Sequence, residues 1–161
     1  MIRTLVLAAV LVAPLGAAAQ ELPTAPYLPL DLATKAADAA LKACAAQGHN
    51  FSVAIVARDG ATKVLLKADD SGPHTVTSAQ GKAFTSAALG RDTAGLAEFI
   101  ASKPANDGLR DMDARMVIQA GGLPVKLGKA LVGGIGVGGA PSGDLDAGCA
   151  TAGLKAIGAA Q

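Results

Sequence analysis

Two histidines occur in this chain of 161 residues, and His74 is the better placed of them to do chemistry. It lies in the run Gly72-Pro73-His74-Thr75-Val76-Thr77, between a predicted strand and a predicted helix, where functional side chains are often found. Its imidazole can ligate haem iron, and the hydroxyl groups of Thr75 and Thr77 lie in the same place. The alternative is a surface or helix-capping histidine without a ligand. His49 is interpreted as a solvated loop residue.

The residues around His74 do not form a recognisable catalytic set. A hydroxyl nucleophile needs a base and a group that orients the base, and the sequence places no carboxylate near His74. Met112 and Met116 are candidate second ligands for an iron, although an isolated methionine on a strand more often packs in the core. The residues therefore indicate a binding site and leave open whether the protein is an enzyme.

The two cysteines, Cys44 and Cys149, are predicted to lie on two different helices. A disulfide between them would close a loop of about a hundred residues and stabilise the fold by about 4 to 5 kcal/mol in the chain-entropy model. The alternative is a pair of small buried thiols that pack as apolar side chains. A metal site at this pair is disfavoured, because neither cysteine has another cysteine or a histidine at ligand spacing.

Closely spaced glycines resemble two nucleotide-binding motifs, and both assignments fail. Gly134-x-Gly136-x-x-Gly139 matches the dinucleotide fingerprint, but the chain ends before the second strand and the acidic residue that such a fold needs. A phosphate-binding loop is excluded by the six-residue spacing of Gly122 and Gly128, and by Ala130 after Lys129. We interpret these glycines as positions of tight turns and close backbone contact.

Four helices should position the candidate residues. Asp31 is predicted to cap the first helix and Gly48 to end it. Gly90 should end the second helix, and Asp144 should cap the last one, where the helix dipole favours negative charge. The predicted ranges are 31–48, 77–89, 93–102 and a last helix from Asp144 onward.

Five strands are predicted from short apolar runs bounded by turn residues, at 51–57, 64–66, 116–119, 123–127 and 130–137. Asp59-Gly60 indicates a hairpin with a type I′ turn, which needs positive φ, and Gly128-Lys129 indicates a second hairpin. Pro124 places its strand at an edge of the sheet or is its first residue. Since the strands do not alternate strictly with helices, the pattern predicts an α+β fold with a mainly antiparallel sheet.

The first nineteen residues are predicted to be a secretory signal. Arg3 supplies the positive charge, residues 5–15 the apolar stretch and residues 17–19 the small-residue cleavage site, so cleavage is expected before Gln20. A loose segment over 20–30 would then precede a single domain over 31–161. No segment is long and apolar enough for stable membrane insertion. The mature protein is therefore expected in the periplasm or the medium.

The composition narrows the range of partners. Without Arg3 the chain carries thirteen basic and thirteen acidic side chains, which gives no electrostatic reason to expect nucleic acid. Only four aromatic residues occur, too few for a platform on which bases stack. A small core rich in alanine would leave apolar faces uncovered, and such faces are stable in water when buried against another copy. A homo-oligomer is therefore predicted.

Three parts of the sequence resemble a known family. They are Asp59-Gly60 after an apolar strand, Lys82-Ala83-Phe84-Thr85 within a predicted helix, and the glycine-rich run from Gly121 to Asp146. Together they resemble the GlcG/HbpS-like proteins, which are described as haem-binding or haem-degrading. The resemblance extends from about Leu30 to Ile157. It implies a profilin-like arrangement of a five-stranded sheet with helices packed on it.

The same resemblance implies a haem or related tetrapyrrole ligand, bordered by the loop that holds His74 and the helix after it. Lys82 is the basic residue that the family pattern singles out, and it can pair with a haem propionate as a point charge. The alternative for Lys82 is a structural ion pair with an acid such as Asp146. Oxidative degradation of haem is implied as an activity. The alternatives are a non-catalytic homo-oligomeric assembly module and a corrinoid-binding domain.

Overall fold

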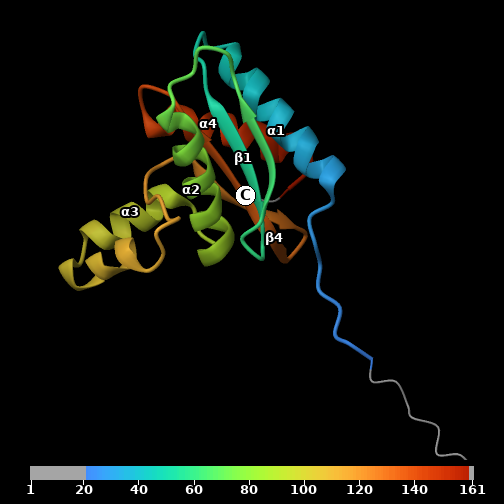
Figure 1. The fold of residues 1–161 in the computed structure, drawn as a ribbon. Coiled ribbons are helices and arrows are strands. Elements are labelled where there is room, and N and C mark those ends of the chain that lie inside the picture. The colour runs from blue at the N-terminus through green and yellow to red at the C-terminus, as the bar shows by residue number, and fades with distance from the viewer. Residues whose placement is uncertain (1–20, 160–161) are drawn as a thin grey trace, which may run out of the picture.

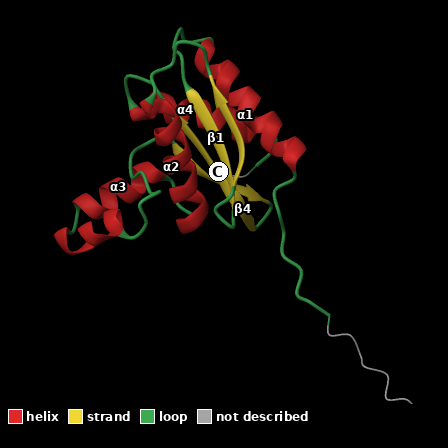
Figure 2. Ribbon diagram, viewed as in Figure 1, coloured by secondary structure: helices red, strands yellow, loops and turns green. Residues whose placement is uncertain are grey.

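The computed structural model describes residues 21–159, which form four α-helices, one 3₁₀ helix and one sheet of four antiparallel strands (Figures 1 and 2). In chain order the elements are α1 (Leu30–Ala45), β1 (Ser52–Ala57), β2 (Thr62–Lys67), α2 (His74–Leu89), α3 (Thr93–Ala101), η1 (Pro104–Asp111), β3 (Gly122–Leu127), β4 (Ala130–Gly138) and α4 (Gly143–Ala156). This confirms the α+β class. The predicted signal over 1–19 lies outside the described residues, and among 21–159 no helix is long and apolar enough to cross a membrane.

The sheet has the order β2-β1-β4-β3 and separates two apolar clusters. Side chains that alternate along β1 divide between its faces, as a strand requires. Val53 and Ile55 point toward α1 and α4, where they pair across the strands with Val137 and Ile135. Ala54 on the other face packs with the small side chains of α2. The result is a three-layer domain, with α1 and α4 on one face of the sheet and α2 on the other (Figure 2).

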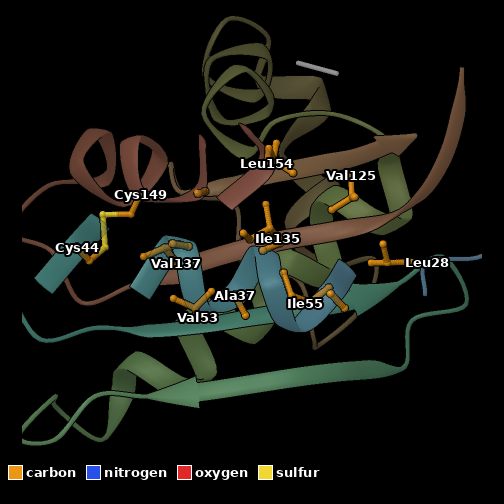
Figure 3. Packing of buried hydrophobic residues seen from close by; sticks show 14 of the residues in the cluster. Leu28, Ala37, Cys44, Val53, Ile55, Val125, Ile135, Val137, Cys149 and Leu154 are labelled. Carbon is orange, nitrogen blue, oxygen red and sulfur yellow. A yellow bond between two sulfur atoms is a disulfide. The ribbon is translucent and has the colours of Figure 1, made fainter. Parts of the chain in front are cut away.

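The larger cluster lies between the sheet and the pair α1 and α4 (Figure 3). Its helix residues are mostly alanines, which let α1 approach α4 closely. At one end of this cluster a disulfide joins Cys44 of α1 to Cys149 of α4, with Cα atoms 5.5 Å apart and both residues fully buried. The structure thus contains the bridge for which the sequence left two alternatives.

Helix α2 lies unusually close to β4, because β4 carries glycine where it passes beneath the helix. A Cβ atom added to Gly136 would lie 3.1 Å from the Cα atom of Ala83 and closer still to the Ala79 carbonyl oxygen. At Gly134 an added Cβ would lie 2.7 Å from the Ala87 nitrogen. These clashes are with backbone, which cannot rotate away. Two glycines of the apparent dinucleotide motif, Gly134 and Gly136, therefore serve helix-to-sheet packing, whereas Gly139 has a positive φ of 134°.

Replacement of Gly136 by alanine should destabilise the protein by about 1 to 3 kcal/mol, the usual cost of overpacking a filled core. Gly148 provides the matched control, since it is exposed on α4 and an added Cβ would meet nothing within 4 Å. Gly148→Ala should stabilise by about 0.5 to 1 kcal/mol, because it removes flexibility from the unfolded chain. Urea unfolding of both variants measures the difference. Equal effects of the two substitutions would contradict the packing argument.

The expected strand over 116–119 is wrong, and the sheet has four strands instead of five. This segment crosses α2 and makes its hydrogen bonds there: the Val117 amide donates to Thr85 Oγ1 at 3.0 Å, and Thr85 Oγ1 donates to the Gly81 carbonyl at 2.8 Å. The Val117 carbonyl also accepts from Thr85 Oγ1 at 3.3 Å, so the backbone of Val117 is paired with α2 and not with β3. An apolar run alone does not distinguish these two arrangements.

Several element ends also differ from the expected ones. Helix α1 begins after Pro29, so Asp31 lies in its first turn and does not cap it, and Ser142 caps α4 in place of Asp144. Helix α2 begins at residue 74 instead of 77. The turn after β1 is not type I′, because only Gly60 has positive φ and its amide donates to the Ala57 carbonyl at 2.9 Å. Gly90 ends α2 in the left-handed region, as predicted.

Candidate functional site

His74 is the first residue of α2, and its side chain is exposed. The helix begins here because Pro73 has a fixed φ of −63° and lacks the amide that a helix start leaves unpaired anyway. Thr75 helps to hold this turn: its hydroxyl lies 2.8 Å from the Gly72 carbonyl oxygen and 2.8 Å from Ser52 Oγ. Because Thr75 is only 1% exposed, it supports the site from inside. The exposed side chain of His74, in contrast, is accessible to a ligand.

Thr77 lies one turn further along α2 and borders a cavity of about 280 Å³. The cavity is enclosed by α2, the start of β2 and the segment over 114–117 that crosses the helix. Phe84 forms much of its floor together with apolar atoms from β1 and Val117. His74 itself does not line this hollow; it lies about one helical turn before Thr77, on the same side of α2. The lining of the hollow includes Val56, Thr62, Thr77, Gln80, Phe84 and Val117.

Arg115 lies at the rim of this hollow, with its guanidinium 4.0 Å from the centre of the Phe84 ring. Asp113 holds the guanidinium from the other side, with Arg115 Nη2 2.6 Å from Asp113 Oδ2 and Nε 2.9 Å from Oδ1. These hydrogen bonds lower the pKa of the Asp113 carboxyl to about 2. They use two of the three guanidinium nitrogens, so the Nη1 group keeps donors for an anionic ligand.

Lys82 lies elsewhere, within the protein. Its ammonium forms an ion pair with Asp146, with Nζ 2.7 Å from Oδ2, and also donates to the Val137 carbonyl at 3.0 Å. Asp146 Oδ1 accepts the Ala140 amide at 3.0 Å. Burial raises the pKa of the Asp146 carboxyl, against the opposing effect of Lys82. Lys82 is 1% exposed, so the structure favours the structural ion pair over pairing with a propionate.

The remaining candidate ligands do not gather around His74. His49 is half-buried after α1, where its ring meets Phe51 edge to face at 5.8 Å. Met116 packs against the apolar residues of α2, whereas Met112 is 60% exposed beside η1. Within 21–159 no three His, Cys, Asp or Glu side chains lie together as a metal site would need. Among the described residues His74 is therefore the best-placed candidate for a single axial ligand.

A family model described as haem degrading protein HbpS-like matches residues 28–155. The chain belongs to the HbpS-like family. Its relatives include HbpS of Streptomyces reticuli, solved as a double mutant, at 44% identity over 89% of this chain and 96% of that one, with a TM-score of 0.79.

More distant solved structures share the fold. Klebsiella pneumoniae protein ORFY is 21% identical over 90% of this chain and all of its own, with a TM-score of 0.80. PduOC, solved in complex with haem, is 23% identical over 84% of this chain and 98% of its own, with a TM-score of 0.77. At these identities the likeness establishes the fold alone. No curated protein matches the chain.

Proposed function

We propose that this protein is an exported haem-binding protein, and that haem lies on the face of α2 that carries His74 and Thr77. One observation supports this most directly: a chain of the HbpS-like family presents an exposed imidazole about one helical turn from Thr77, which borders an apolar hollow. The structural neighbour PduOC binds haem, which supports the same ligand class. When bound, haem would supply a redox-active iron, and the His74 imidazole would be its protein ligand.

The residues present suit part of a haem. His74 offers the nitrogen, and the hollow beside Thr77 and Phe84 offers an apolar surface for the macrocycle. At about 280 Å³ the hollow is at the lower limit of ligand pockets, which are typically about 300 to 1,000 Å³. This hollow would therefore hold only part of the macrocycle. Arg115, with donors left on Nη1, is the proposed propionate partner in place of Lys82.

Export is part of the proposal and is supported by the disulfide between Cys44 and Cys149. Such bonds persist in the periplasm and outside the cell and are rare in the cytosol. Self-association also stays a prediction, for which the exposed side chains of Tyr27, Phe99 and Met112 offer apolar surface.

Haem titration of the mature protein tests the site. The wild type should produce a specific Soret band, and His74→Ala should shift or weaken this band because the iron loses its protein nitrogen. We expect the dissociation constant to rise on the order of tenfold, equivalent to about 1.4 kcal/mol. His49→Ala is the matched control, since this second histidine lies outside the proposed site. His49→Ala should bind haem with the same affinity and the same Soret band as the wild type.

The outcomes separate the hypotheses. A wild type without a specific band excludes haem binding and favours the assembly module, whereas equal loss in both histidine variants excludes His74 as the specific ligand. Arg115→Met should weaken haem binding without shifting the Soret band, because it removes a propionate contact and does not change the ligand of the iron. Cobalamin in place of haem tests the corrinoid alternative. Loss of the band with iron release under reductant and oxygen, with catalase present, would indicate degradation of haem.

A further inference from the structure

A second hollow, of about 320 Å³, lies on a different part of the molecule from His74. It is formed where α2 ends and α3 begins, against the outer edge of β3 and one side of α4. Leu123, Pro124 and Leu154 give it an apolar floor. β3 has a sheet neighbour on one side only, so the hollow straddles an open sheet edge. The proposed haem site does not use any of these residues.

The walls of this hollow are fixed by local contacts. Gly90 has a φ of 65°, which ends α2 and turns the chain directly into α3. Asp92 caps α3 by accepting the Gly95 amide at 2.6 Å. Thr93 Oγ1 donates to the Gln119 carbonyl at 2.6 Å and accepts the Gly122 amide at 2.9 Å, which ties α3 to the start of β3. The hollow is therefore built before any ligand arrives.

Two cations line the hollow, Arg91 and Lys126. Arg91 lies over the Phe99 ring, 5.0 Å from its centre, which orients the guanidinium without neutralising it. Among the ion pairs of the described residues neither cation takes part. The one carboxylate in the lining, Asp92, is engaged by the α3 backbone. The lining thus carries a net positive charge above an apolar floor, with the Thr151 hydroxyl beside it.

We propose that this hollow binds a small organic anion. Its carboxylate lies between Arg91 and Lys126, and its apolar body rests on Leu123, Pro124 and Leu154. A carboxylate fits because guanidinium and ammonium groups both donate charge-assisted hydrogen bonds to it. A body about the size of one aromatic ring suits a hollow at the lower end of the ligand-pocket range.

Benzoate is a suitable probe, and benzamide is its neutral counterpart of the same shape. Calorimetric titration of the haem-free protein at low salt should detect benzoate at millimolar concentration, and benzamide at least about tenfold more weakly, since charged hydrogen bonds are stronger than neutral ones. Lys126→Met and Arg91→Met should each weaken benzoate binding about tenfold. Lys129→Met is the matched control, because Lys129 lies in the turn after β3 and does not line the hollow.

Three results would overturn this proposal. They are the absence of binding heat when benzoate is added, benzamide binding as tightly as benzoate, and an equal loss of benzoate affinity in Lys126→Met and Lys129→Met. Circular dichroism of each variant checks that its fold is retained. Because the titration uses no haem, its failure leaves the haem proposal intact. Conversely, a protein that binds benzoate and not haem refutes the haem proposal alone.

Discussion

Replacing both Cys44 and Cys149 by alanine should lower the free energy of unfolding by about 4 to 5 kcal/mol. The bridge joins residues 105 positions apart, so its loss returns a large amount of conformational freedom to the unfolded chain. A domain of this size is typically stable by only about 5 to 15 kcal/mol. The variant should therefore be close to its unfolding limit, which urea titration measures as a large fall in the midpoint.

The reduced wild type is the control for this change. Treatment with a thiol reductant under mild denaturation should bring the wild type to the stability of the double variant, whereas the variant itself should not respond. A reductant effect on the variant would mean that another group is responsible. A loss of less than about 1 kcal/mol would mean that α1 and α4 stay in contact in the unfolded chain without the bridge, so that the bridge restricts the unfolded chain little further.

Local signals in the sequence predicted the elements well. Gly90 ends α2 because glycine takes the left-handed conformation without cost, and Gly128 does the same for the turn between β3 and β4. Pro124 predicted either an edge strand or the first residue of a strand, and the structure shows the edge strand, where a missing amide leaves no gap in the ladder. These features depend on a few neighbouring residues, so the sequence is sufficient to predict them.

Features that depend on packing between distant segments are harder to predict from the sequence. The segment over 116–119 resembles a strand in composition, but its partner is Thr85 of α2, more than thirty positions away. Arg115 and Phe84 meet only because this segment crosses the helix, so the sequence contained no spacing that could indicate their contact. The sequence allows Lys82 to pair with Asp146 or with a propionate, and the structure shows the ion pair with Asp146.

Replacing Lys82 by methionine should destabilise the protein by about 3 to 5 kcal/mol, because it leaves the Asp146 charge buried without a partner. Lys42 and Asp38 make the matched control: their ion pair is equally short, at 2.6 Å, but both side chains are more than half exposed. Lys42→Met should cost no more than about 1 kcal/mol. Chemical denaturation of the two variants at neutral pH therefore compares the stability lost with a buried ion pair with that lost with an exposed ion pair of nearly the same length.

The double variant Lys82→Met with Asp146→Asn identifies the cause of that loss. Asparagine keeps an oxygen for the Ala140 amide and carries no charge, so most of the lost stability should return. Burial raises the pKa of Asp146 in the folded protein, and a raised carboxyl pKa gives stability that is present at acid pH and lost as the pH rises. The single variant should therefore approach the double variant at acid pH and fall below it toward neutral pH. A double variant that is as unstable as the single variant at neutral pH would show that lost packing, and not the unpaired carboxylate, explains the defect.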